Sequence, residues 1–378
     1  MEQKKKLLIV SNNYPSELDI YANAFIHSRV VYYTKELDVQ VLIYNPNKRY
    51  TRYQYENIPV QVTNDKRQFK HFLETYKPDI IAIHFVEAWM FKSFIKDSTC
   101  PIYIWVHGAE ALGWYRRLFN LTNLKVFLAY IKNNIIQLVG LNRIIRHSNQ
   151  FGKIKFIFVS NWMKRITEHD TFSKIKQVEI IPNPIDTNIF EYIPKEKEKR
   201  MKILLIRPFD SRKYANDMAI KAIQELHKRS FFKDLEISIY GKGKFFTHLT
   251  DKIKNYPNVN ITNTFIEHTK IPLIHQRYGI FLCPTRQDAQ GVSMCEAMSS
   301  GLVVITSENT AIPEFVEDNK TGLLTHGPKE IADKIEFLYY HPELFSYISQ
   351  RASIHIREIA GHTSVIQREI ALLTSKTN

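Results

Sequence analysis

Short apolar runs alternate with segments of helical spacing along the first half of the chain. The apolar runs are rich in β-branched residues and lie at residues 6–11, 39–44, 79–85, 101–107 and 155–160. Between them, helical patterns lie near residues 22–35, 66–76 and 87–95. Buried strands that alternate with helices are typical of a parallel sheet covered on both faces. The pattern therefore predicts a doubly wound α/β domain.

The pattern begins again after a charged, proline-containing stretch at residues 191–201. Apolar runs then occur at residues 202–207, 235–243, 279–284 and 302–307, and helical patterns lie near 216–227, 246–254, 292–299 and from 329 onward. We expect two Rossmann-like domains that face a cleft: residues 1–185, a linker at 186–200, residues 201–355, and a last helical segment at 356–378. Ligands of such sheets bind beyond the carboxyl ends of the strands.

Composition indicates a globular, cytosolic protein of two domains. A chain of 378 residues with 44% hydrophobic residues can form two domains with cores of their own. The three cysteines, Cys100, Cys283 and Cys295, have no metal-like spacing and predict reduced thiols in a cytosolic protein. The apolar run at 122–141 is interrupted by Lys and Asn, so it predicts no membrane span.

Familiar cofactor and metal motifs are absent from the sequence. No G-x-G-x-x-G follows the first strand, which disfavours a dehydrogenase, and there is no Walker A motif. HxH, CxxC and DxD motifs are also absent, which predicts a protein without a metal site. Only 12 glycines occur, so we expect each to lie where the local backbone conformation requires glycine.

The strongest chemical signal is the stretch TRQDAQGVSMCEAMSSG at residues 285–301. Asp288 lies in the loop after a strand, Gly291 lies at the start of the next helix, and Glu296 lies on that helix. A helix N-terminus attracts an anion, and a carboxylate can accept bonds from the two hydroxyls of a ribose. Alternatively, Asp288 and Gln290 cap the helix and Glu296 faces solvent.

This stretch resembles the E-x7-E signature of retaining GT-B glycosyltransferases of family four. Five further segments resemble motifs of that family in the same order: VSNWMK (159–164), IPNPIDTNIF (181–190), Arg207 with Arg212 and Lys213, YGKG (240–243), and the closing PE and TGLL elements at 313–324. The resemblance covers most of the chain. It implies an acceptor-binding N-terminal domain, a donor-binding C-terminal domain, and a last helix that packs back on the N-terminal domain.

The resemblance implies a donor site in the C-terminal domain. Glu296 would bind the ribose, Arg207 and Lys213 would neutralise the diphosphate as it leaves, and Asp288 would contact the transferred sugar. Asp288 stands where the family has a glutamate and is one methylene shorter. The other residues implied in donor binding are Gly108, Arg212, Gly241, Gly243, Ala289, Gln290, Gly291 and Val292.

In the N-terminal domain, His107 and Gly108 resemble the family's HG loop, which implies a catalytic histidine beside the reacting carbon. A histidine at a strand end can equally be structural. Tyr14, Pro15 and Ser16 occupy the first loop on the acceptor side, where the family's double glycine is missing, and Glu110 is a weaker acceptor-side candidate.

The activity implied is transfer of a sugar, with retention of configuration, from a nucleotide-diphosphate sugar that serves as co-substrate, a UDP-sugar being favoured. The expected acceptor is a lipid-linked cell-envelope glycan of the capsule, O-antigen, exopolysaccharide or teichoic-acid type. No resident cofactor is expected. The alternatives are a nucleotide-sugar epimerase of the same fold and a non-catalytic glycan- or membrane-binding relative.

Positive charge is concentrated in one segment. The whole chain has a formal charge of +14. Residues 111–167 contribute +10 of it, because they hold ten Lys and Arg and no Asp or Glu. Aromatic and aliphatic residues between these cations fit a helix on an anionic membrane, which predicts a cytoplasmic protein peripheral on the inner face of the plasma membrane. The expected membrane-facing residues are Trp114, Arg116, Arg117, Lys125, Lys132, Arg143 and Arg146.

The basic segment also fits two alternatives to a membrane-facing helix. It can be a core-packed helical pair with basic outer faces, or a basic groove for an anionic soluble acceptor. Nucleic acid is not expected as a partner, because no nucleic-acid-binding motif accompanies the charge.

Overall fold

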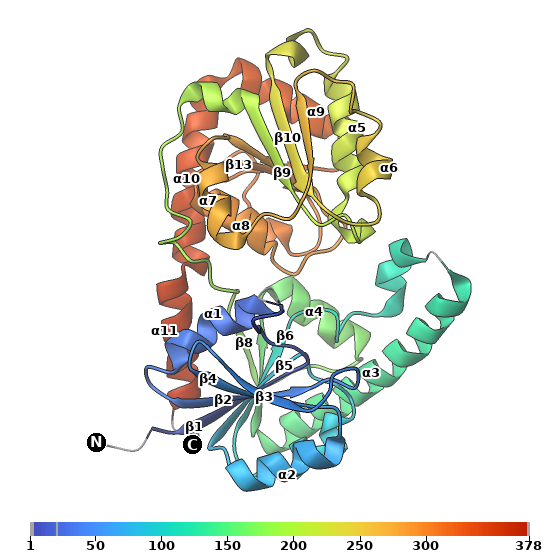
Figure 1. Cartoon of the computed structure of the whole chain (residues 1–378), viewed down its shortest axis with the longest axis vertical. Helices are drawn as coiled ribbons and strands as arrows, with labels where there is room; N and C mark the ends of the chain where they lie inside the picture. Colours follow the sequence, from blue (N-terminus) through green and yellow to red (C-terminus); the bar gives the residue numbers. More distant parts are fainter. Residues whose placement is uncertain (1–3, 20–21, 122, 376–378) are drawn as a thin grey trace. The chain divides into compact units, whose positions relative to one another are not determined.

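A computed structural model describes residues 4–19, 22–121 and 123–375 (Figure 1). The chain divides into two compact units: unit 1 comprises Met1–Pro182 and Val365–Asn378, and unit 2 comprises Asn183–Ser364. The expected boundary at residue 185 lies three residues later than this division. The stretch expected to be a linker, 186–200, belongs to unit 2, as do residues 356–364 of the expected last segment.

Unit 1 is built on an eight-stranded sheet of order β3-β4-β2-β1-β5-β6-β7-β8. Its strands are β1 (Lys6–Ser11), β2 (Asp38–Tyr44), β3 (Thr51–Tyr55), β4 (Ile58–Thr63), β5 (Ile80–His84), β6 (Ile102–Val106), β7 (Ile154–Phe158) and β8 (Val178–Ile180). All neighbouring strands are parallel except the β3–β4 hairpin at the edge. The predicted α/β class is confirmed.

Helices cover both faces of this sheet. They are α1 (Ala24–Tyr33), α2 (Lys66–Tyr76), α3 (Leu124–Phe151), α4 (Asn161–Asp170) and α11 (His362–Thr374), with a short π-helix at Phe91–Ile95 and a 3₁₀ segment at Trp114–Asn120. One face packs Leu7, Val39 and Val60 against α1 and α11. Within that core, the Tyr33 hydroxyl donates to the Glu369 carboxylate at 2.6 Å, and Arg29 lies 3.4 Å from the same carboxylate.

The helix expected at residues 87–95 is shortened to the five-residue π-helix, because α3 packs directly against this loop. Gly140 of α3 approaches Ala88 so closely that a Cβ atom at Gly140 would lie 2.2 Å from the Ala88 Cβ. The Gln137 side chain accepts from the Ala88 N–H at 2.9 Å and donates to the Val86 carbonyl at 2.8 Å. These contacts hold the loop in an irregular conformation.

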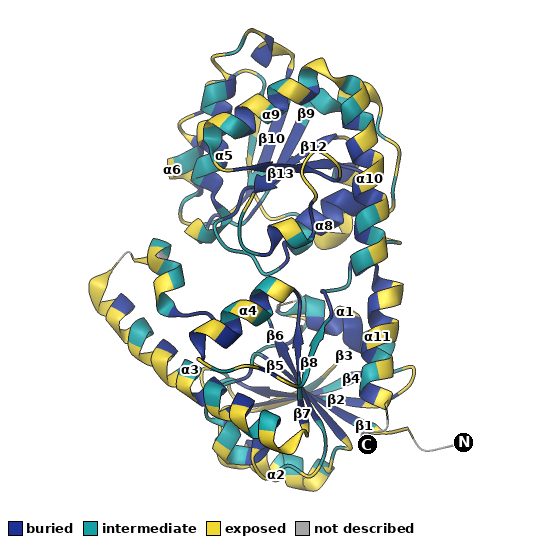
Figure 2. Ribbon diagram, turned by 180° about the vertical axis from the view of Figure 1, so that it is seen from behind, coloured by how far each residue is buried: buried dark blue, intermediate teal, exposed yellow. Residues whose placement is uncertain are grey.

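Unit 2 is built on a six-stranded, fully parallel sheet of order β11-β10-β9-β12-β13-β14. The strands are β9 (Lys202–Ile206), β10 (Glu236–Gly241), β11 (Val259–Asn263), β12 (Ile280–Leu282), β13 (Val303–Ser307) and β14 (Leu323–Thr325). The helices are α5 (Asn216–Leu226), α6 (Phe246–Thr250), α7 (Ile271–His275), α8 (Val292–Ser299), α9 (Pro328–Tyr340) and α10 (Pro342–Ala360). Figure 2 shows the buried strands and the partly exposed helices around them.

Each sheet has one point where the strand order reverses. In unit 1 the chain adds β2 and β4 on one side of β1, and β5, β6 and β7 on the other. In unit 2 it adds β10 and β11 on one side of β9, and β12, β13 and β14 on the other. A crevice opens at such a switch point beyond the carboxyl ends of the strands, where ligands of open α/β sheets bind. The functional residues are therefore sought after β1 and β5, and after β9 and β12.

Candidate functional site

Arg207 lies at the switch point of unit 2, directly after β9. Its side chain reaches across to the loop after β12, where Nη2 donates to the Cys283 carbonyl at 3.0 Å. The residue is only 5% exposed, and its Nε makes no hydrogen bond within the part of the chain that the structure describes. A buried cation with an unused donor is costly unless an anion binds beside it. The geometry thus fits an anion-binding role.

The loop that carries Lys213 is fastened to the loop after β12. The Arg286 N–H donates to the Lys213 carbonyl at 2.7 Å, and the Thr285 hydroxyl donates to the same carbonyl at 3.1 Å. The Arg286 guanidinium also makes a bidentate pair with Asp217 at 2.7–2.8 Å. Lys213 lies in a 3₁₀ turn before α5 rather than in the helix itself, with its ammonium 4.6 Å from the centre of the Tyr214 ring.

Arg212, the neighbouring candidate, is exposed, and its guanidinium lies 5.6 Å from the Phe245 ring centre. Lys213 is only partly exposed, and the Arg207 guanidinium also lies over the Tyr214 ring, at 5.6 Å. The Tyr214 ring therefore contacts both cations, Arg207 and Lys213. Their juxtaposition at the switch point forms a compact positive site.

Asp288 uses one carboxylate oxygen to shape the loop before α8. Its Oδ1 accepts from the Gly291 N–H at 2.8 Å and from the Gln290 N–H at 3.2 Å. The Gln290 side chain is buried and bonded at both ends to the backbone of Asn183. These two backbone N–H groups and the Gln290 amide are therefore engaged within the protein. Ala289 and Val292 are partly exposed on either side.

Gly291 has a φ of +80° and begins α8, so its backbone conformation suits glycine. At Gly241 and Gly243, close packing also requires glycine. A Cβ at Gly241 would lie 2.3 Å from the Arg207 carbonyl oxygen, and one at Gly243 would lie 2.5 Å from the Asp210 nitrogen. Both glycines therefore allow the loop that begins at Arg207 to pack against the end of β10.

Glu296 projects from α8 and is 8% exposed, so it does not lie on a solvated helix face. Its Oε1 lies 2.8 Å from His268 Nε2. The hydrogen bond to Glu296 raises the pKa of His268, although partial burial opposes this. The imidazole in turn packs edge-on against Phe190, with the ring centres 5.2 Å apart. His268 thus holds one oxygen of the Glu296 carboxylate.

His107 lies at the switch-point side of unit 1, after β6. Its Nε2 is 2.9 Å from Nδ1 of His84, which ends β5. Burial, and then the charge of Arg29, lower the pKa of His107 to about 3, and burial also lowers that of His84 well below its usual value. The two rings are therefore neutral at physiological pH, and one donates to the other.

Glu110 holds the loop that follows His107. Its Oε1 accepts from the His107 N–H at 2.7 Å, and its Oε2 is buried with no hydrogen-bond partner among the described residues. Burial raises the pKa of this carboxyl. Gly108 has a φ of +125°, which only glycine adopts readily. Phe85, beside His84, also has a positive φ of +63°, which is unusual for a bulky residue and marks a constrained loop.

In the first loop of unit 1, the predicted acceptor-side residues Tyr14, Pro15 and Ser16 are mostly buried. The Tyr14 ring is 1% exposed and packs in the core, where its hydroxyl lies 2.8 Å from His27 Nδ1. Pro15 is buried, and its carbonyl accepts from the Tyr53 hydroxyl at 2.9 Å. Ser16 is partly exposed in a tight turn with Asp19. Of the three, Ser16 has the side chain most open to solvent.

The basic segment, 111–167, includes the 3₁₀ turn, α3, β7 and the first part of α4, and Figure 2 shows exposed positions along the whole of α3. Among the expected membrane-facing residues, Lys125, Lys132, Arg143 and Arg146 are exposed. The residues Leu118, Leu121, Leu124, Val126, Leu128, Ile135, Ile136 and Val139 are exposed as well. By length and composition α3 is able to cross a membrane, in contrast to the expectation from its interrupted apolar run.

Two of the expected membrane-facing residues, Arg116 and Trp114, face inward. Arg116 makes a salt bridge with the buried Asp170, with Nε–Oδ2 at 2.8 Å and Nη2–Oδ1 at 3.0 Å. Trp114 is partly buried, and its ring centre lies 6.4 Å from that of Phe127. Arg117 is partly exposed. The side chains of Arg116 and Trp114 therefore serve the packing of α3 onto unit 1.

Sequence reasoning did not find His84, His268 or Gln137. His84 and His107 are 23 residues apart, and His268 and Glu296 are 28 apart, so only the fold pairs them. Gln137 looked like one polar position in a mixed helix, yet it bridges the loops after β5 and β6 through the carbonyls of Val86 and Glu110. The signal available in the sequence was a polar residue at a position of α3 that the helical spacing of its apolar residues predicts to face inward.

No group of three or more His, Cys, Asp or Glu side chains within residues 4–19, 22–121 and 123–375 is arranged to hold a metal ion. Within the same ranges, Cys100, Cys283 and Cys295 are free thiols, and the last two are buried.

Residues 200–341, which hold the unit 2 site, match the family model described as "Glycosyl transferases group 1". The alpha-monoglucosyldiacylglycerol synthase of Acholeplasma laidlawii is 26% identical over 112 residues, which are 30% of this chain and 28% of that protein. The GtfA subunit of the UDP-N-acetylglucosamine–peptide N-acetylglucosaminyltransferase of Streptococcus pneumoniae serotype 4 is 24% identical over 196 residues, 50% of this chain and 37% of that one. The chain thus aligns with well under half the length of either relative.

Solved structures resemble the whole chain. Sucrose-phosphate synthase from Thermosynechococcus elongatus has a TM-score of 0.72 at 12% identity and covers 98% of both chains. Anabaena HepE in complex with UDP and glucose has a TM-score of 0.70 at 14% identity and covers 98% of this chain and 100% of its own. These likenesses show that the chain has the GT-B fold of glycosyltransferases.

Proposed function

We propose that this protein is a retaining, metal-independent glycosyltransferase that moves a sugar from a nucleotide-diphosphate donor, with UDP-sugars favoured, to a lipid-linked cell-envelope glycan. The observation that carries the proposal is Arg207: a buried guanidinium with an unused donor, at the switch point of the unit that matches the glycosyl transferases group 1 model. Lys213 adds a second cation beside it. Two cations at that point suit the two negative phosphates of a sugar nucleotide.

The chemical task of these residues is to stabilise the departing diphosphate. As the bond from the sugar carbon to the phosphate oxygen breaks, negative charge grows on that oxygen, and Arg207 and Lys213 would stabilise it. The acceptor hydroxyl oxygen bonds to the sugar carbon on the face that the diphosphate leaves, and its proton passes to the leaving diphosphate oxygen, which gives retention. Glu296, oriented by His268, accepts bonds from the ribose diol.

His107 acts as a neutral hydrogen-bonding group toward the donor sugar rather than as an acid. Because its pKa is about 3, the imidazole is neutral at pH 7 and lacks the second ring proton that an acid would give. Support for a UDP-sugar donor comes from the names of similar proteins, because HepE was solved with UDP and glucose and the pneumococcal relative is named for UDP-N-acetylglucosamine.

The donor site is tested by UDP, GDP or ADP release from the corresponding sugar nucleotides by the purified full chain. We expect UDP release from a UDP-sugar and its loss by at least about 100-fold in Glu296→Gln, which keeps the shape but removes the charge. Glu308→Gln, which changes a half-exposed glutamate outside the site, is the control. Equal rates in both variants would refute the site. An epimeric sugar nucleotide without nucleotide release would identify an epimerase instead.

For the acceptor, we propose that the exposed face of α3 lies on an anionic membrane, which would place the protein on the cytoplasmic surface. Lys125, Lys132, Arg143 and Arg146 are interspersed with exposed Leu, Ile and Val, the composition of interfacial helices. Asn134, on the inward face, bonds the backbone of Trp114 and Leu112. A helix anchored in this way suits a position along the surface rather than across the bilayer.

Co-sedimentation with vesicles tests this placement. The full chain should bind phosphatidylglycerol-containing vesicles and bind phosphatidylcholine vesicles weakly, with binding reduced by high salt. Lys132→Glu combined with Arg143→Glu should weaken binding about tenfold or more, whereas Lys254→Glu with Lys270→Glu, on the surface of unit 2, should not. Equal absence of binding to both vesicle types would refute the membrane proposal and leave the donor site standing. Tight, salt-sensitive RNA binding would favour nucleic acid.

A further inference from the structure

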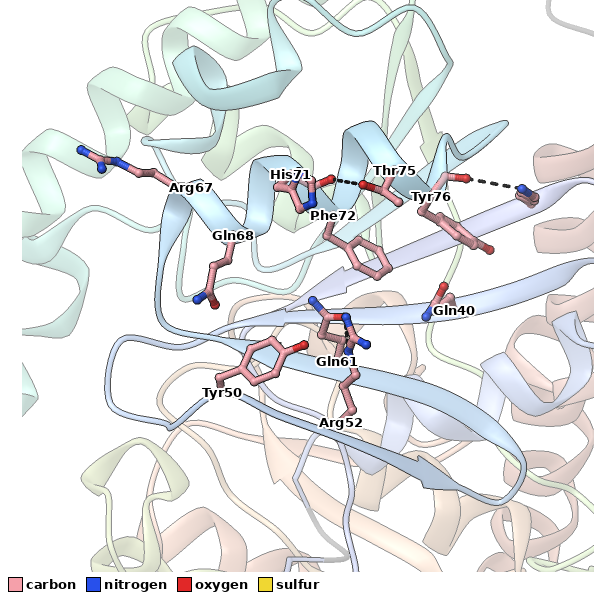
Figure 3. A pocket seen from close by; sticks show the side chains of 11 residues that line it. Gln40, Tyr50, Arg52, Gln61, Arg67, Gln68, His71, Phe72, Thr75 and Tyr76 are labelled. Atoms are coloured by element: carbon pink, nitrogen blue, oxygen red, sulfur yellow. Dashed lines mark hydrogen bonds between the residues drawn. The ribbon is translucent and has the colours of Figure 1, made fainter.

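Unit 1 contains a cavity of about 770 Å³ at the edge of its sheet, away from both switch-point loops. It lies between α2 and the strands β1, β2, β3 and β4 (Figure 3). Lys6 is the first residue of β1, Gln40 lies near the start of β2, and Tyr76 ends α2. The cavity therefore extends toward the amino ends of these strands, opposite the edge where the switch-point ligands bind. Its volume is in the range of small-ligand sites.

The part of the sheet face that borders the cavity is polar. Side chains alternate between the two faces of a strand. Leu7, Val39 and Val60 pack in the core on the α1 side. Their neighbours Lys6, Gln40 and Gln61 point to the opposite side, where a covered sheet is normally apolar.

Helix α2 does not fill this space. The structure describes every residue of this helix, Lys66–Tyr76, and Phe69 alone among them is buried. Its partly buried Phe72 and Tyr76 form the wall of the cavity instead, and Figure 3 shows Phe72 pointing from α2 toward the strands. The floor is thus made of amides and the wall of aromatic rings.

The polar groups of the floor have unused hydrogen-bonding capacity. Gln61 Oε1 accepts from Arg52 Nε at 2.9 Å, and its amide nitrogen makes no further bond in the described structure. The Gln40 amide makes no side-chain hydrogen bond among those residues either. Adjacent amides can bind the hydroxyls of a sugar.

The charge of the lining is positive. Lys6, Arg52 and Arg67 contribute cations, and none of the lining residues is Asp or Glu. Asp38 and Asp79 lie nearby, at the Tyr76 end, where together with burial they raise the pKa of the Tyr76 hydroxyl. The end near Arg52 therefore favours a negative group more than the end near Tyr76 does.

We propose that this cavity is a binding site for an acidic oligosaccharide, with the sugar hydroxyls on Gln40 and Gln61 and a carboxylate or phosphate substituent on Arg52. A guanidinium held by Gln61 presents its remaining N–H groups in a fixed direction, which suits a bidentate anion. This site is separate from the donor site, and the proposal stands whether or not the protein transfers a sugar.

A nucleotide is the main rival, since it also combines rings, amides and phosphate. The rings of this cavity are already engaged. Tyr76 stacks on Phe72 with centres 5.6 Å apart, and the Lys6 ammonium lies 5.5 Å from the Tyr76 ring centre. The Arg52 guanidinium lies 5.7 Å from the Tyr50 ring centre. Base stacking would have to displace these contacts, whereas hydroxyl binding to the amides would not.

Isothermal titration of the full chain with tetragalacturonate, maltotetraose and AMP tests the proposal. We expect tetragalacturonate to bind and maltotetraose, which has no charge, to bind at least about tenfold more weakly. Arg52→Ala and Gln40→Leu should each weaken tetragalacturonate binding about tenfold. Lys70→Ala, on the same helix α2 but outside the lining, should leave the affinity within about twofold.

The thermal unfolding of each variant is measured alongside. Arg52 is exposed and its variant loses one hydrogen bond, to Gln61, so it should still fold and decides the outcome if Gln40→Leu is unstable. No binding of tetragalacturonate to the wild type at millimolar concentration would overturn the proposal. Equal loss in Arg52→Ala and Lys70→Ala would overturn it as well, because binding would then be diffuse. Tighter binding of AMP than of the saccharide, weakened by Arg52→Ala, would overturn the proposal and make the cavity a nucleotide site.

Discussion

Replacing Arg207 with methionine should separate catalysis from stability. Methionine keeps much of the length of the side chain and removes its charge. If Arg207 binds the departing diphosphate, its loss removes an interaction worth up to about 4 kcal/mol, the energy of two unit charges ~4 Å apart at an effective dielectric of about 20. The rate of nucleotide release should therefore fall by about 10² to 10³, as for the loss of one oriented donor in other enzymes.

The same substitution should cost the fold little. The folded protein loses one charge-assisted hydrogen bond to the Cys283 carbonyl, about 1.5 to 3 kcal/mol, and a buried cation–π contact with Tyr214, about 2 kcal/mol. It is also relieved of a guanidinium that is 5% exposed with an unused Nε, and burying a charge costs several kcal/mol. The melting temperature of unit 2 should stay constant or rise by about 2–4 °C per kcal/mol gained.

The assay combines initial rates of UDP release with calorimetric melting of the same preparations. Arg277→Met, which changes an exposed arginine, is the matched control and should alter neither quantity. A melting temperature lowered by more than about 4 °C, with UDP release within threefold of the wild type, would show that Arg207 is structural and would refute the reasoning.

Three further outcomes are expected. Gly243→Ala should destabilise unit 2 by about 2 kcal/mol or more in denaturant unfolding, because φ is +144° and the new Cβ would lie 2.5 Å from the Asp210 nitrogen; an unchanged midpoint would contradict this. His275 is 1% exposed, and burial lowers its pKa to about 3, so its contribution to stability is complete above about pH 6.5 and is lost as the pH falls toward 3, by up to about 1.4 kcal/mol per pH unit. His275→Gln should flatten that slope and the exposed His248→Gln should not; equal slopes would refute the assignment. Gln137→Leu should lower kcat with little change in the affinity for UDP, because it frees the loops after β5 and β6 in unit 1 and leaves unit 2 intact; a loss of UDP affinity alone would argue against this.

Much of the architecture could be predicted because the strands are continuous apolar runs. The expected strand at residues 6–11 and the helices at 66–76 and 292–299 have the predicted bounds. The β3–β4 hairpin was not predicted. Its turn has Glu56 and Asn57 at positive φ, whereas the usual sequence signal of such a turn is Asn-Gly. Pro59 lies inside the second strand, and a proline in a run argues against a strand.

The candidate site was predictable in its position but not in its contacts. Motifs that follow strands indicated Arg207, Asp288 and His107, because strand ends converge at a switch point. What the sequence could not supply is which partner each side chain takes. The Asp288 carboxylate bonds two backbone N–H groups of its own loop, and Glu296 takes His268, a residue with no periodic signal. Such pairings depend on loop geometry that no local pattern encodes.

The chain leaves unit 1 at Pro182 and returns to it at Val365, so unit 1 is completed only after all of unit 2 has been made. During synthesis at about 5–20 residues per second, roughly 10 to 40 s pass between the two parts. Over that interval Arg29 and Tyr33 lack Glu369, and the face of the sheet beneath α11 lacks its cover. The nascent N-terminal half therefore exposes this apolar face for longer than a contiguous domain would, and unit 2 is the first part of the chain to be synthesised in full.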